Sequence, residues 1–294
     1  MLKNSKLLLS KNAKQLLEEY LNNPFQGLLI VGSKGSGKTS ILDLLASELL
    51  AIDLAQVQNS SYILRLAPEG SSNSISIASV HQIDRFFGRS VSLPKGKHSS
   101  IARIVIIDDA EKMSIEAQNA LLKNLEEPSK NSVFLLSCSD TNKILATLIS
   151  RVRSIRLTNP SRIEIKEFLR PLSKNDAIVE QAINMSGGVP GLAIALALNQ
   201  DEHSLFKAST TLKQILNASI YERLLLINTL YKDMSLVTDV LYLMQQMSRL
   251  ALETAETKQS IRWQKILNIA YITEKYLEKN TNPKLTLTNL MLNL

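Results

Sequence analysis

The 294-residue sequence contains a single cysteine, Cys138. One thiol excludes a disulfide within the chain and any zinc site built from four cysteines. The three histidines, His81, His98 and His203, are scattered along the sequence, so we expect surface residues rather than metal ligands.

Long apolar runs are also missing. No stretch is long enough to cross a bilayer, and the three leucines at 7–9 are too few for the apolar part of a secretory signal. Together with the single cysteine, this predicts a cytoplasmic protein that does not engage a membrane. The sequence contains no repeat and no low-complexity segment.

The sequence has no long basic run either, although its net charge is +7 and its pI about 9.3. A thinly spread positive charge permits a polyanionic partner such as DNA without requiring one. The apolar fraction of 45% and the length allow two or three domains with real cores.

The most informative stretch is Gly32–Thr39, which reads G-x-x-x-x-G-K-T. An apolar strand pattern at 28–31 precedes it and a helical pattern at 40–50 follows it, which is the context that a phosphate-binding loop requires. Glycines let the backbone aim several N–H groups inward, and these groups, together with the helix N-terminus, attract phosphates. We expect Lys38 on the outer phosphates and the Thr39 hydroxyl on Mg²⁺.

Strands and helices alternate through the first half. Apolar strand patterns occur at 28–31, 61–66, 101–107, 133–136 and 152–157, and helical patterns at 10–22, 79–89, 114–127 and 144–149. The segment 95–98 looks like an exposed turn. This alternation predicts an α/β domain with a mostly parallel sheet, in which ligands bind at the carboxyl ends of the strands.

Asp108 and Asp109 directly follow the apolar, β-branched run at 101–107. A carboxylate there can hold the Mg²⁺ that bridges the phosphates, and a second one can orient or deprotonate a water. Two acidic turn residues are the plainer interpretation, but the intact phosphate loop favours a nucleotide site.

After residue 160 strand patterns nearly vanish. Capping boxes begin at Ser161 and Ser219, and stripes with i, i+3, i+4 spacing continue to the C-terminus. Leu285 and Leu287 alternate, so a strand start is an open alternative to a last helix there. We interpret the stripes as helix–helix packing.

The strings at 104–113, 117–128, 134–139 and 147–151, above all A-L-L-K-x-L-E-E-P, resemble the clamp-loader branch of the AAA+ ATPases. The segments at 74–83, 186–191 and 282–294 extend the resemblance, which is thin between about 200 and 280. It implies a nucleotide-binding domain at 1–158, a small helical lid at 159–207 and a helical collar domain for oligomerisation at 208–294.

The resemblance also implies partners and roles. The chain would be one subunit of a hetero-pentamer that opens a sliding clamp and places it on primer–template DNA, with ATP and Mg²⁺ as cofactors. Arg151 matches an arginine that reaches the nucleotide of a neighbouring subunit, and Ser139 matches a polar sensor position. The expected nucleotide and metal contacts are Gly32, Gly35, Ser36, Gly37, Lys38, Thr39, Ser40 and Asp108, with Asp109 as the catalytic carboxylate.

Four departures from the family pattern matter. Asp109 stands where active members have glutamate, and it is about 1.5 Å shorter, a misplacement that can cost roughly 100-fold in rate. No arginine lies within 187–193, where a lid arginine would touch the nucleotide. Val152 replaces a cysteine after Arg151, and the stretch 56–60 lacks the ligands of the zinc module found in many relatives, so we expect no zinc.

These departures favour a subunit that holds ATP with weak or no hydrolysis of its own. A hydrolysing motor subunit of the same loader, a free-standing P-loop enzyme such as a kinase, and a scaffold with a relic loop are the alternatives. A kinase would need an acceptor pocket that the helical second half does not display.

Overall fold

We analysed a computed structural model, which describes residues 7–69, 73–89, 101–173, 175–200, 203–254, 257–279 and 281–294. The chain divides into two compact units, Met1–Pro160 and Ser161–Leu294. The turn expected at 95–98 and His98 lie outside the described residues.

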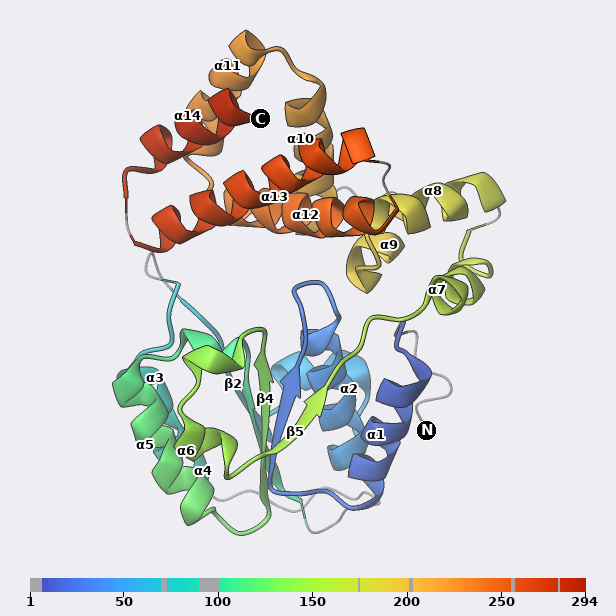
Figure 1. Cartoon of the computed structure of the whole chain (residues 1–294). Coiled ribbons are helices and arrows are strands. Elements are labelled where there is room, and N and C mark those ends of the chain that lie inside the picture. The colour runs from blue at the N-terminus through green and yellow to red at the C-terminus, as the bar shows by residue number, and fades with distance from the viewer. Residues whose placement is uncertain are drawn as a thin grey trace. The chain divides into compact units, whose positions relative to one another are not determined.

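The first unit contains a five-stranded parallel sheet in the order β2-β3-β4-β1-β5 (Figure 1). The strands are β1 (Gly27–Val31), β2 (Ile63–Leu66), β3 (Arg103–Ile107), β4 (Ser132–Cys138) and β5 (Arg153–Arg156). The central strands β1 and β4 are buried at every residue, as apolar strands covered on both faces should be.

Helices cover both faces of this sheet (Figure 1). One face packs on α1 (Lys11–Asn22) and α2 (Lys38–Leu50) in a core that includes Leu28, Ile30 and Ile106. The alternate residues of the same strands, such as Leu29 and Ile107, face a second core. That second face carries α3 (Ile77–Val80), α4 (Gln82–Phe87), α5 (Ile115–Glu126) and α6 (Ala146–Ile149).

Short 3₁₀ turns lie at η2 (Leu54–Asn59), η3 (Ala110–Lys112) and η4 (Thr141–Lys143).

Cys138 is fully buried, and burial raises the pKa of its thiol to about 12. The predicted α/β class with a mostly parallel sheet is confirmed.

The described part of the second unit is helical. Its elements are α7 (Arg162–Leu169), α8 (Asp176–Ser186), α9 (Pro190–Ala197), α10 (Ser204–Asn217), α11 (Ile220–Leu230), α12 (Met234–Thr254), α13 (Thr257–Glu278) and α14 (Pro283–Asn293). Residues of α9 to α14 share one apolar core. The finer division into a lid at 159–207 and a collar at 208–294 stays a prediction.

Most expected elements appear within a few residues of their predicted ends. The capping boxes at Ser161 and Ser219 both form, and the segment around Leu285 and Leu287 is helical. The single helix predicted at 79–89 is wrong in detail, because the chain forms α3 and α4 with a break at His81. Among the described residues, no helix is long and apolar enough to traverse a bilayer.

Candidate nucleotide site

The phosphate loop connects β1 to α2 at the carboxyl edge of the sheet. Gly35 and Gly37 have φ values of 76° and 85°, in the left-handed region that favours glycine. A Cβ on Gly37 would meet nothing within 4 Å, so the requirement for glycine there is conformational rather than steric. A Cβ on Gly32, in contrast, would come within 2.7 Å of the Ser36 hydroxyl oxygen.

Lys38 is folded onto this loop. Only 8% of the residue is exposed, and its Nζ donates to the carbonyls of Gly32 (3.0 Å) and Ser33 (3.2 Å) and to Ser139 Oγ (2.8 Å). Burial lowers the pKa of Lys38, and the nearby carboxylates of Asp109 and Glu111 oppose that shift. The ammonium thus lies where strands β1 and β4 end, close to the predicted sensor residue Ser139.

Ser36 gives the loop an unsatisfied polar atom. Its Oγ is buried and has no hydrogen-bond partner among the described residues. Buried hydroxyls are usually paired, so an unpaired one beside a glycine loop fits a ligand that brings its own oxygens. The loop N–H groups, Lys38 and Ser36 therefore suit a polyphosphate.

Asp108 lies directly after β3 and is largely buried. Thr39 Oγ1 donates to Asp108 Oδ1 at 3.2 Å, so the two expected Mg²⁺ ligands are side by side. Hydroxyl and carboxylate oxygens are the donors that Mg²⁺ prefers, so the two side chains are ligands of the right chemical type for that ion. Among the described residues no cluster of three His, Cys, Asp or Glu side chains could hold a metal by itself.

Sequence reasoning missed Arg65, which reaches into this site from β2. Its Nη1 donates to Asp108 Oδ2 at 2.6 Å, and its Nη2 donates to Asp43 Oδ1. The pairing of β2 with β3 places Arg65 opposite Ile106, two residues before Asp108. Side chains two apart on a strand share a face, so this register, which is not readable from the sequence, brings Arg65 and Asp108 together.

Asp109 adopts the left-handed conformation, with φ 48°, and its N–H donates to Ser137 Oγ at 3.0 Å. Its carboxylate is about two-fifths exposed and pairs with Lys112 at 3.6 Å. Glu111, which the sequence did not single out, accepts the Ser139 N–H at 3.0 Å. Of the acidic residues after β3, Asp108 thus contacts Arg65 and Thr39. Asp109 pairs with Lys112, and Glu111 accepts the Ser139 N–H.

Arg151 lies at the opposite end of the sheet, where the parallel strands begin. It precedes β5, and the pairing of β5 with β1 places Arg153 beside Leu28, at the start of β1. The five residues of β1 separate this end of the sheet from the phosphate loop by about 15 Å, because a strand rises about 3.3 Å per residue. Arg151 is therefore not part of its own chain's phosphate site.

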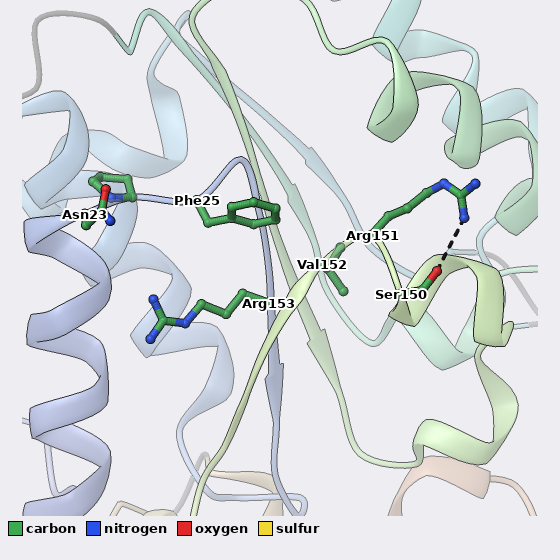
Figure 2. Close-up of a pocket in the computed structure, with 7 residues that line it drawn as sticks. Asn23, Phe25, Ser150, Arg151, Val152 and Arg153 are labelled. Carbon is green, nitrogen blue, oxygen red and sulfur yellow. Dashed lines mark hydrogen bonds between the residues drawn. The ribbon is translucent and has the colours of Figure 1, made fainter.

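Arg151 is one of the residues that line a pocket of about 350 Å³ (Figure 2). Its lining residues are Asn23, Pro24, Phe25, Ser150, Arg151, Val152 and Arg153. Figure 2 shows Arg151 and Arg153 extending to opposite sides of the chain, with Val152 between them. Arg151 forms an ion pair with Glu126 and donates to the Thr147 carbonyl at 2.7 Å.

The parallel sheet, the glycine loop after β1 and the acidic residues after β3 define a P-loop domain of the AAA+ type. A family model described as "DNA polymerase III, delta subunit" matches residues 9–161, more than half of the chain. The chain belongs to this family, within the clamp-loader AAA+ proteins.

Two similar proteins are named as subunits of replication factor C and of DNA polymerase III. Replication factor C subunit 4 of Saccharomyces cerevisiae is 26% identical over 269 residues, covering 85% of this chain and 80% of the yeast protein. The Escherichia coli DNA polymerase III subunit delta' is 31% identical over 158 residues, covering 53% of this chain. That match spans 44% of the E. coli protein, less than half of its length.

A solved structure has a similar fold. The DNA polymerase III gamma subunit-related protein of Thermotoga maritima superimposes with a TM-score of 0.55 over 95% of this chain and 97% of that one. The two sequences are 21% identical, so this likeness concerns the fold alone.

Proposed function

We propose that this chain is a delta-prime-like subunit of a replicative clamp loader, which binds ATP and supplies Arg151 to the nucleotide site of a neighbouring subunit. The observation that supports this proposal best is the location of Arg151, at the end of the sheet opposite its own phosphate loop. To act as an arginine finger, an arginine that cannot reach the phosphates of its own chain would have to contact those of a neighbouring subunit.

ATP binding is supported by the phosphate loop. Its N–H groups, Ser36 and Lys38 would hold the phosphates, and Gly32, Gly35, Gly37 and Ser40 complete the cradle. Thr39 and Asp108 are the oxygen ligands that the chain offers to Mg²⁺, which when bound neutralises phosphate charge. Lys38 would exchange its carbonyl contacts for phosphate oxygens while Ser139 stays within reach.

Weak hydrolysis is supported by Asp109. Its carboxylate is one methylene shorter than a glutamate and is paired with Lys112, so it is a poor candidate to orient an attacking water. We therefore propose ATP binding with little or no turnover by the isolated chain.

The partners follow from the same proposal. They are the other subunits of a hetero-pentameric loader, the sliding clamp and primer–template DNA, in the cytoplasm. The helices of 159–207 would form the lid and those of 208–294 the collar that joins the subunits.

The first experiment is ATP binding and hydrolysis by the isolated chain beside Lys38→Ala. We expect binding that the substitution abolishes, with negligible phosphate release, because Lys38 is the principal cation of the loop. Brisk turnover by the unmodified chain would contradict the proposal and favour the motor subunit, and absence of binding would favour a scaffold.

The second experiment tests Arg151 in trans. In a loader reconstituted with its partner subunits, Arg151→Ala should lower the ATPase rate by at least 10-fold, because an arginine finger stabilises transition-state charge. Arg153→Ala is the matched control, since Arg153 lines the same pocket but points the other way (Figure 2). Equal rates for Arg151→Ala and the unmodified loader would refute the role.

A second candidate is a gamma-like motor subunit of the same loader. The observation that favours it is the assembled set of Lys38, Thr39, Asp108 and Ser139, which a motor also needs. Turnover by the isolated chain separates the two candidates.

A further inference from the structure

We propose that Arg65, by occupying the Asp108 carboxylate, keeps the affinity of this nucleotide site for a divalent cation low, so that Mg²⁺ adds little to ATP binding. The proposal rests on the nucleotide binding proposed above and adds a property of its own, a low affinity for divalent metal at the Asp108 carboxylate.

The geometry of Asp108 carries the first step. Both of its carboxylate oxygens are engaged, Oδ1 by the Thr39 hydroxyl at 3.2 Å and Oδ2 by Arg65 Nη1 at 2.6 Å. A metal ion would have to share this carboxylate with a guanidinium that stays charged at all accessible pH values. A fixed positive charge within hydrogen-bond distance of a ligand oxygen disfavours a second cation there.

Asp43 carries the second step. It lies on α2 four residues after Thr39, on the same helix face, and Arg65 pairs with it through Nη2. The pKa of Asp43 is raised by burial and by the Asp108 charge, and lowered by Arg65. Without Arg65, two neighbouring carboxylates and a hydroxyl would remain together, a set of hard oxygen ligands typical of Mg²⁺ or Mn²⁺ sites.

The three charged side chains of this site are largely buried. The exposed fractions of the three side chains are 25% for Arg65, 16% for Asp43 and 12% for Asp108. Charges buried to this degree are screened less than charges at the surface, so a metal ion has to compete with strong ion pairs of Arg65 for these carboxylates. The same arginine also ties β2 to α2 and β3, and this structural role must be separated from the electrostatic one.

The test compares ATP affinity in excess Mg²⁺ with affinity in EDTA, using the full chain. For the unmodified protein we expect the two dissociation constants to differ by less than about 3-fold. Arg65→Gln should make binding at least 10-fold tighter with Mg²⁺ than in EDTA, while Arg65→Lys, which keeps the charge, should behave like the unmodified chain.

Mn²⁺ binding, followed by the loss of the free-ion electron paramagnetic resonance signal, provides a readout that needs no nucleotide. Arg65→Gln should bind Mn²⁺ at least 10-fold more tightly than the unmodified chain. Arg162→Gln is the matched control, because Arg162 also pairs with a carboxylate, Glu180, but in the second unit. It should change neither readout.

Tightening of ATP binding by 10-fold or more with Mg²⁺ in the unmodified chain would overturn the proposal, and that measurement does not depend on how a variant folds. Equal Mn²⁺ affinities of the unmodified chain and a folded Arg65→Gln would also overturn it. If ATP binds under neither condition, the proposed function fails, and the Mn²⁺ comparison still decides the role of Arg65.

Discussion

At the scale of single residues, Asp109 is where a small change should alter chemistry. Asp109→Glu restores the missing methylene and should raise the ATPase rate of the isolated chain by about 10-fold or more, since a misplacement of about 1 Å can cost roughly 100-fold. The substitution should also destabilise the fold by about 1 kcal/mol, because residue 109 has φ 48° and glutamate tolerates that region less well than aspartate. Phosphate release and urea unfolding measure the two effects.

Asp109→Asn is the control for this prediction, because it keeps the length and the backbone preference but removes the charge. It should remove any residual turnover without loss of stability. An Asp109→Glu rate equal to that of the unmodified chain would show that the shorter carboxylate does not limit hydrolysis.

The residues of the site differ in how far the sequence reveals them. The predicted phosphate loop is a contiguous string, so Lys38 and Thr39 can be singled out from spacing alone; in the structure Lys38 contacts the Gly32 carbonyl and Thr39 contacts Asp108. Ser139 follows a buried strand and was expected at the same sheet edge; its hydroxyl lies 2.8 Å from Lys38 Nζ. Arg65 could not be found this way, because its importance depends on the register of β2 against β3.

At the scale of helices and strands, the local signals in the sequence are strong where a cap is present. The Ser219 capping box is complete, with Glu222 N–H donating to Ser219 Oγ at 3.4 Å and Ser219 N–H donating to the Glu222 carboxylate at 2.7 Å. Ser219→Ala should destabilise the second unit by about 1 kcal/mol, because it leaves a helix N-terminal N–H without its side-chain acceptor. Urea unfolding followed by Trp263 fluorescence measures this loss.

Glu222→Gln is the matched control, because glutamine can fill the same position of a capping box. It should cost less than Ser219→Ala. An unchanged unfolding midpoint for Ser219→Ala would mean that water replaces the cap without loss.

The elements that the sequence did not specify lack such local signals. The region of α10 was predicted to be helical, but no separate helix was named there. Its cap is His203, whose Nδ1 accepts from Leu205 N–H at 3.3 Å, rather than a serine or aspartate. His203 was expected at the surface but is half-buried, and burial lowers its pKa. The break between α3 and α4 follows no proline or glycine, so the pattern of apolar residues there looked continuous.

At the scale of the whole chain, the two units have separate apolar cores, and we expect each to unfold in its own transition. The sequence offers a probe for each. Cys138, the single cysteine, is buried in the first unit, where its raised pKa of about 12 keeps the thiol protonated and unreactive at pH 8. Trp263, the single tryptophan, packs against the core of the second unit.

ATP should therefore stabilise one transition and not the other. At a concentration of 100 times the dissociation constant, a ligand that binds only the native state adds about 2.7 kcal/mol to its stability. In a urea titration we expect Cys138 labelling by a thiol reagent to require more urea when ATP is present, while the Trp263 transition stays in place. Lys38→Ala should abolish the shift of the first transition and serves as the control. Coincident transitions that both shift with ATP would instead mean that the two units unfold as one cooperative structure. Nucleotide binding in the first unit would then also stabilise the helices of the second.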